Sequence, residues 1–216
     1  MIPIVFATAG DPIGSGLVAT LARPGGNVTG ISSQASDSVG KRLELLREII
    51  PGLRRFAVLA NLASSFPALE LDEVQAACRT LGLEVFPFDI RRDQDIALAF
   101  EALKDHAEAL YVIADPLVST NRVRINTLAL GVHLPTMHTV REFVEAGGLM
   151  SYGTDFSALG QRLANIVDQI LKGRKPGDIP IFQSTKFELA INLRTAKALG
   201  ITVPPELLTT ADEVIE

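Results

Sequence analysis

The sharpest local pattern that could support chemistry is a glycine spacing near the start of the chain. Gly14-x-Gly16-x-x-Ala19 follows an apolar stretch at residues 2–7. This spacing satisfies the G-x-G-x-x-G/A pattern of dinucleotide-binding loops, and Asp37 lies about 20 residues further on, where that pattern places a ribose-binding acid. The sequence therefore offers a nucleotide-dependent, Rossmann-like enzyme as one interpretation.

Three features of the same segment make this interpretation the alternative rather than the leading one. Six residues separate the apolar stretch from Gly14, although the pattern needs a tight turn there, and Pro12 lies among them. The helix that we expect at 14–22 must also end before Pro24. Such a helix is too short to support a pyrophosphate well.

A polar loop, Thr8, Ala9, Gly10 and Asp11, directly follows the apolar stretch. Backbone N–H groups at the end of a strand, next to the start of a helix, bind anions in general, including carboxylates. Thr8, Ala9 and Gly10 are therefore candidate ligand-binding residues. Asp11 is a further candidate, but it could equally only cap the turn that begins at Pro12.

Polar side chains also end three apolar segments further along the chain. Asn61 ends FAVLAN, Asp115 ends ALYVIAD, and Tyr152 lies in the final residues of GLMSYG. In open parallel sheets ligands bind at the carboxyl ends of the strands, so Asn61 and Asp115 are expected to face one crevice. Two other roles stay open: Asp115 as a cap of the turn at Pro116, and Tyr152 as a packing residue at a hinge.

No spacing typical of catalysis or of a metal site stands out. His106, His133 and His138 have no partner at metal-ligand spacing. The sequence contains no G-x-S-x-G elbow and no carboxylate pair suited to acid–base catalysis. We therefore expect a binding protein rather than an enzyme, with no catalytic residue, no cofactor and no metal.

The composition is that of a folded, acidic protein. The 216 residues are 47% hydrophobic and 21% charged, and the net charge is −5. This acidity argues against a nucleic-acid-binding surface. The basic residues of one stretch alternate with acids and are expected to form a solvated face; they are Lys41, Arg42, Arg47, Arg54 and Arg55.

The elements that must position these residues alternate between strands and helices. Apolar runs rich in β-branched residues predict strands at 2–7, 28–32, 56–61, 84–89, 109–115, 134–138, 148–153 and 187–193. Amphipathic spacing predicts helices at 14–22, 37–50, 68–81, 93–104, 119–131, 140–146, 155–172 and 194–199. This alternation predicts an α/β fold with mainly parallel sheets covered by helices on both faces.

Several long segments together resemble one family. They are PIVFATAGDPIGSGLVATLARPGGNVTGIS, GKRLELLREIIPGLRRFAVLAN, ALYVIADPL, REFVEAGGLMSYG and TKFELAINLRTAKALGITVP. Together they resemble the tryptophan-transporter-type ABC transporter substrate-binding proteins over essentially the whole chain. The resemblance implies the periplasmic binding protein type I fold, in which two Rossmann-like α/β/α lobes close on a small ligand by hinge motion.

The resemblance also implies a domain layout. Residues 1–35 belong to a partial N-terminal lobe, 36–150 form the C-terminal lobe, and 151–216 return through the hinge to the N-terminal lobe. Family members carry a leader and several βα units before the segment that corresponds to residues 2–7. The expectation is therefore an N-terminally truncated lobe, with a sheet edge open to pairing in a homodimer.

The function implied by the resemblance is capture of a small molecule, with an amino acid as the candidate ligand, for an ABC transporter permease. The implied cleft residues are Thr8–Asp11, Asn61, Asp115 and Tyr152. The location implied is the periplasm or a membrane-anchored lipoprotein, although the chain as written shows no signal peptide. An effector-binding or assembly module is a further alternative, because repressors share this lobe architecture.

Overall fold

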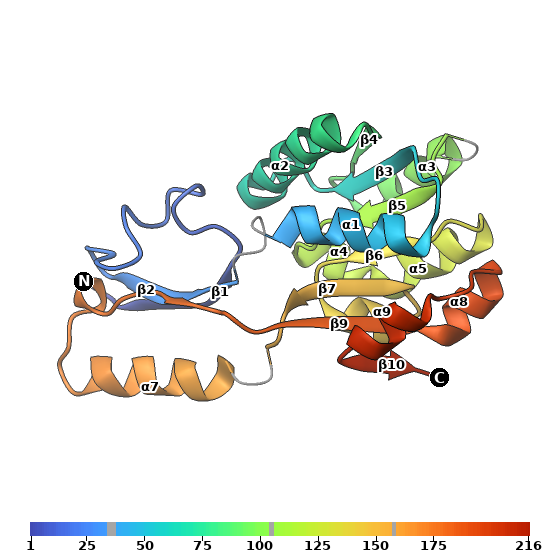
Figure 1. Ribbon diagram of the computed structural model, residues 1–216. Coiled ribbons are helices and arrows are strands. Elements are labelled where there is room, and N and C mark those ends of the chain that lie inside the picture. The colour runs from blue at the N-terminus through green and yellow to red at the C-terminus, as the bar shows by residue number, and fades with distance from the viewer. Residues whose placement is uncertain (34–37, 104–105, 157–158) are drawn as a thin grey trace. The chain divides into compact units, whose positions relative to one another are not determined.

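The computed structural model describes residues 1–33, 38–103, 106–156 and 159–216 (Figure 1). The chain divides into two compact units. The first unit comprises Met1–Ser36 and Thr154–Phe187, and the second comprises Asp37–Gly153 and Glu188–Glu216. The chain therefore passes between the units three times.

The second unit is built on a seven-stranded sheet with the order β10-β9-β7-β6-β5-β3-β4. β3 pairs in parallel with both β4 and β5, and the pairs β5–β6, β6–β7 and β9–β10 are parallel as well. The strands are β3 (Arg55–Ala60), β4 (Glu84–Asp89), β5 (Ala109–Val112), β6 (Thr136–His138), β7 (Met150–Thr154), β9 (Phe187–Asn192) and β10 (Glu213–Ile215).

Helices cover both faces of this sheet. One face packs against α1 (Val39–Ile49), α2 (Ser65–Leu81), α8 (Leu193–Leu199) and α9 (Pro205–Thr210). The other packs against α3 (Asp93–Leu103), α4 (Pro116–Thr120), α5 (Arg122–Gly131) and α6 (Arg141–Glu145). Side chains alternate between the faces along each strand, so that β3 sends Phe56 and Val58 to the first core and Ala57 and Leu59 to the second. This arrangement confirms the predicted α/β fold with parallel strands.

The first unit holds a smaller parallel sheet in the order β1-β2-β8. Its strands are β1 (Ile4–Ala9), β2 (Val28–Ser32) and β8 (Phe182–Gln183). The helix α7 (Leu159–Leu171) packs on this sheet through a small core of Ile31, Leu159, Ile166 and Ile179 (Figure 1). A 3-10 turn, η2 (Pro176–Asp178), leads into β8.

Two elements differ from the sequence-based expectation for this part of the chain. The helix expected at 14–22 is replaced by successive turns. The strand expected at 187–193 is β9. The implied domain layout places it in the hinge return to the N-terminal lobe, but it pairs within the larger sheet. The reason for the second difference is packing, because Leu189 and Ile191 are buried in the core beside α1, α2 and α8.

Candidate functional site

The larger sheet has a topological switch point between β3 and β5. The chain leaves β3 to form β4 on one side, and then returns to form β5 on the other side. Ligands of open parallel sheets bind outside the carboxyl ends of the strands at such a point. Asn61 directly follows β3, and Asp115 lies just after β5. The sequence reasoning selected these two residues, and the structure brings them together.

Asn61 and Asp115 are joined by a hydrogen bond. The Asn61 Nδ2 atom donates to the Asp115 Oδ2 atom at 2.8 Å. The Asn61 Oδ1 atom in turn accepts from the Ala63 backbone N–H at 3.2 Å, which holds the amide in one orientation. Both side chains are half-buried. The carboxylate is therefore fixed in position but still reachable.

Asp115 also performs the capping role that the sequence left open. Its Oδ1 atom accepts from the Val118 backbone N–H at 2.7 Å, and Asp115 is the N-cap of α4. An ionised carboxylate has about four acceptor positions, so these two bonds leave room for a cationic ligand group. Capping and ligand binding are compatible at this residue.

Tyr152 lies in β7, one residue before the chain passes to the first unit. Its side chain is half-buried and packs against the core beside α1 and α2. Its backbone carbonyl accepts a hydrogen bond from the Arg42 Nε atom at 2.7 Å. The position of Tyr152 is thus tied to a charged group inside the second unit.

Arg42 belongs to a closed buried network that the sequence reasoning missed. The Arg42 Nη1 atom donates to the Glu70 Oε1 atom at 2.7 Å and also to the Tyr111 hydroxyl. The Tyr111 hydroxyl donates to the same Glu70 oxygen at 2.7 Å. Arg42 and Glu70 are 1% and 0% exposed as side chains, so the prediction of a solvated face at Arg42 is wrong. The available signal was its position on α1, three residues after Val39 and four before Leu46, both on the buried face.

Burial controls the protonation of this network. Burial raises the pKa of the Glu70 carboxyl, while the Arg42 charge and the hydrogen bond from Tyr111 oppose that rise. Burial also raises the pKa of the Tyr111 hydroxyl well above its ordinary value. Tyr111 is therefore a neutral donor to Glu70 and acceptor from Arg42. The Glu70 Oε2 atom is buried without a hydrogen-bond partner among the described residues.

The predicted loop of the first unit lies at the carboxyl end of β1. Thr8 and Ala9 are the last residues of β1, and the Ala9 carbonyl accepts from the Ser33 backbone N–H at 2.9 Å. The Asp11 Oδ1 atom accepts from the backbone N–H groups of Ile13 and Gly14 at 3.1 and 2.8 Å. Asp11 therefore caps a turn, the second of the two roles left open for it. A ligand-binding role for Thr8, Ala9, Gly10 and Asp11 stays a prediction.

The glycine pattern does not form a dinucleotide-binding loop. Such a loop holds the pyrophosphate of the bound dinucleotide at the N-terminus of a helix. Residues 12–17 instead form turns closed by bonds such as Ser15 N–H to the Asp11 carbonyl, and Gly16 has a left-handed φ of 72°. Asp37, which the pattern needs for the ribose, lies outside the described residues. The nucleotide-dependent alternative loses its structural basis in the described part of this segment.

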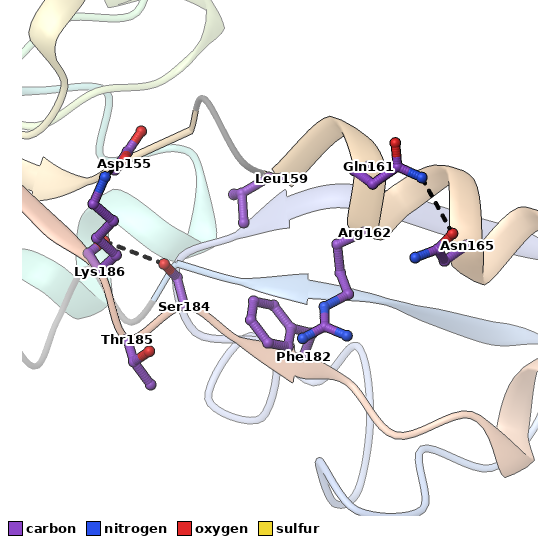
Figure 2. Close-up of a pocket in the computed structure, with 9 residues that line it drawn as sticks. All are labelled: Asp155, Leu159, Gln161, Arg162, Asn165, Phe182, Ser184, Thr185 and Lys186. Atoms are coloured by element: carbon purple, nitrogen blue, oxygen red, sulfur yellow. Dashed lines mark hydrogen bonds and ion pairs between the residues drawn. The ribbon is translucent and has the colours of Figure 1, made fainter.

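The first unit also contains a pocket between α7 and the segment that includes β8 (Figure 2). Its volume is about 300 Å³. Its lining residues are Asp155, Leu159, Gln161, Arg162, Asn165, Phe182, Ser184, Thr185 and Lys186. The sequence reasoning missed this pocket, because the two-residue strand β8 lies in a stretch expected to be loop.

The described residues contain neither a membrane-spanning helix nor a cluster of metal-binding side chains. No helix within 1–33, 38–103, 106–156 and 159–216 combines the length and apolar character needed to cross a bilayer. No group of three or more His, Cys, Asp or Glu side chains in those ranges is arranged to hold a metal ion.

Comparisons with known proteins point to one family. A tyrosine-binding protein of Clostridioides difficile (strain R20291) is 29% identical over 200 residues, which are 93% of this chain and 57% of that protein. The chain thus spans less than two thirds of the length of this curated relative.

Solved structures point to the same family. A conserved domain protein of Vibrio cholerae has a TM-score of 0.92 at 28% identity, covering 98% of this chain and 71% of that one. An ABC domain from Streptococcus pneumoniae in complex with L-Trp has a TM-score of 0.90 at 30% identity, covering 99% and 72%. The fold is that of the type I periplasmic binding proteins. The model of the family described as ABC transporter substrate binding protein matches residues 1–215, and this chain belongs to that family.

Proposed function

We propose that this chain carries the solute-binding function of an ABC transporter and that its ligand is an amino acid. Two relatives support the ligand class, one named a tyrosine-binding protein and the other solved with L-Trp. Because the chain spans 57% of the curated relative, the activity of the whole protein is part of the proposal. Capture by closure of two lobes, which the family resemblance implies, is part of it too.

The single observation that carries the proposal is the Asn61–Asp115 pair at the switch point of the larger sheet. Asp115 provides a half-buried carboxylate held by Asn61 and by the start of α4. A fixed carboxylate of this kind suits a ligand ammonium group, because charge-assisted hydrogen bonds are the strong ones. The hydroxyl and backbone N–H groups of Thr8, Ala9 and Gly10 suit the ligand carboxylate.

The family supports a cellular setting for the proposal. Its members are typically extracellular proteins or lipoproteins, and they deliver their ligand to a membrane permease. We include a permease partner and a location outside the cytoplasm in the proposal. The proposal also includes homodimer formation through the sheet edge at β1, which pairs with β2 alone among the described strands.

The test is calorimetry with a panel of amino acids that includes L-Tyr, L-Trp and their D-forms, on the wild type and on Asp115→Asn. Asparagine is as good an N-cap as aspartate, so the variant removes the charge and keeps the start of α4. We expect the affinity for the best ligand to fall about tenfold or more. Asp72→Asn removes an exposed charge from the same unit and should leave the affinity unchanged.

Two results would count against the proposal. Equal affinity of the wild type and Asp115→Asn would remove Asp115 from ammonium binding. Absence of saturable heat with every amino acid would remove the ligand class itself.

A further inference from the structure

A stacked arginine forms the centre of the pocket in the first unit. Arg162, on α7, places its guanidinium carbon 4.1 Å from the centroid of the Phe182 ring (Figure 2). Stacking on a ring engages the flat face of a guanidinium. The N–H groups point outward in its plane, so they stay able to donate hydrogen bonds while the group is held in place.

Arg162 has no acidic partner among the described residues, in contrast to Arg91, Arg92 and Arg141. Arg91 and Arg92 pair with aspartates at 2.8 and 3.3 Å, and Arg141 pairs with glutamates on α6, β9 and β10. Within the described ranges, no carboxylate lies within ion-pair distance of Arg162. The one acid that lines the pocket, Asp155, already accepts from the Lys186 ammonium at 2.5 Å.

The rest of the lining is rich in donors. The Gln161 amide donates to the Asn165 Oδ1 atom at 3.4 Å, which leaves the Asn165 amide nitrogen on the Arg162 side of the pocket (Figure 2). The residues Ser184 and Thr185 follow Phe182 along the chain and line the same hollow, and the Ser184 hydroxyl donates to the Lys186 backbone carbonyl at 3.3 Å. A second hollow of about 310 Å³ is also lined by Arg162 and Phe182. The basic side chains that line the two hollows are Arg162, Arg174 and Lys186, and the acidic one is Asp155. The local charge is therefore positive in a chain whose net charge is −5.

We propose that this pocket binds an oxyanion, a carboxylate or phosphate group carried by a small solute, with the Arg162 guanidinium as its anchor. The fork of N–H groups matches the two oxygens of such a group, and the ring of Phe182 holds the fork before the ligand arrives. The volume of about 300 Å³ is at the lower end for small-molecule pockets, which suits a compact anion. This site uses none of the residues proposed for amino-acid binding, so the two proposals can fail separately.

The test is a titration followed by ¹⁵N–¹H correlation spectra, with inorganic phosphate in one series and citrate in another. Chloride keeps the ionic strength constant, because a general screening effect would otherwise imitate binding. We expect saturable shifts of the Arg162 Nε–H signal and of the Thr185 and Lys186 amides in at least one series. Saturation by phosphate alone identifies a phosphate site, and saturation by citrate alone identifies a carboxylate site.

Two variants at exposed positions, one on α7 and one directly after it, distinguish a specific site from a general effect of positive charge. Arg162→Gln should weaken the binding about tenfold or more, since it removes a charge-assisted pair of hydrogen bonds. Lys172→Gln removes a positive charge from the residue that directly follows α7, at a side chain that is 74% exposed and lies outside both hollows. It should change the affinity less than twofold. Absence of saturation with both anions, or equal weakening by the two variants, would overturn the proposal.

Discussion

The two faces of the seven-stranded sheet bury polar groups in opposite ways. On the face covered by α1 and α2, the charged side chains of Arg42 and Glu70 are joined to Tyr111 in a closed triangle of hydrogen bonds. On the face covered by α5 and α6, His138 and Ser151 are neighbours in the register of β6 and β7 and are both buried. Neither His138 nitrogen nor the Ser151 Oγ atom has a hydrogen-bond partner among the described residues.

The difference shows what each kind of group requires of a protein interior. Charges are buried here only with opposite charge and hydrogen bonds, because an unpaired buried charge costs several kcal/mol. Neutral groups can be buried without partners, but they then lose the ability to ionise. Burial lowers the pKa of His138 to about 3, and its ring stacks on Phe143 with centroids 4.8 Å apart.

The largest expected effect is on the face covered by α1 and α2, which buries the charged side chains of Arg42 and Glu70. Arg42→Met leaves the Glu70 carboxylate buried without this cation and removes the hydrogen bond from Arg42 to the Tyr152 carbonyl. We expect the free energy of unfolding to fall by about 3–5 kcal/mol, measured by urea denaturation. The combined variant Arg42→Met, Glu70→Leu, Tyr111→Phe removes all three polar groups and should recover most of that loss. A loss below about 1 kcal/mol in the single variant would show that this network is not a paired buried charge at all.

The second expected effect is the pH dependence of stability that comes from His138. This residue lies on the face covered by α5 and α6, called the neutral face because His138 and Ser151 are buried there uncharged. The His138 imidazole takes up a proton in the unfolded chain below its ordinary pKa of about 6.5, but in the folded protein only below about pH 3. Stability should therefore fall as the pH falls from 6.5 towards 3, and His138 should account for about 2 kcal/mol of loss between pH 7 and pH 5.

Urea denaturation at several pH values checks this contribution. Between pH 7 and pH 5, the free energy of unfolding of His138→Leu should fall by about 2 kcal/mol less than that of the wild type. His106→Gln, which removes an exposed histidine, should keep the wild-type slope. Parallel slopes for the wild type and His138→Leu would contradict a neutral buried imidazole.

The smallest effect separates unpaired from paired hydroxyl groups on the neutral face. Ser151→Ala removes a buried hydroxyl without a partner among the described residues, so stability should stay unchanged or rise by up to about 1 kcal/mol. Thr136→Val is the matched change, because the Thr136 hydroxyl accepts from the Leu149 backbone N–H at 2.9 Å. It should cost about 1–3 kcal/mol. Equal changes in thermal or urea unfolding would mean that the Ser151 hydroxyl does have a partner in solution.

Much of the larger unit could be predicted from local patterns. The run at 56–61 became β3 at Arg55–Ala60, and the run at 84–89 became β4 with the same bounds. The proximity of Asn61 and Asp115 also followed from the sequence, because the carboxyl ends of adjacent parallel strands meet at one edge of a sheet. A short stretch of chain already expresses its hydrophobic periodicity, and the alternation of strands and helices along the chain predicts parallel strands.

The features that the sequence analysis did not predict have two causes: turn-forming residues inside one segment, and contacts between residues far apart in the chain. The turns at 12–17 contain Pro12, Gly14 and Gly16, which disfavour the helix that the neighbouring apolar residues suggested. β8 contains two residues and exists only because β2 pairs with it. The stacking of Arg162 on Phe182 joins a helix to that strand, 20 residues further along the chain.

The sequence by itself determined the α/β alternation, the family, and the two polar residues at the ends of β3 and β5. Only the tertiary structure decided that Arg42 is buried, because its partners Glu70 and Tyr111 lie 28 and 69 residues away. A charged residue on the buried face of a helix is stable inside a protein only when folding brings it opposite charge and acceptors. A local sequence pattern does not show whether those partners will lie next to the residue in the folded protein.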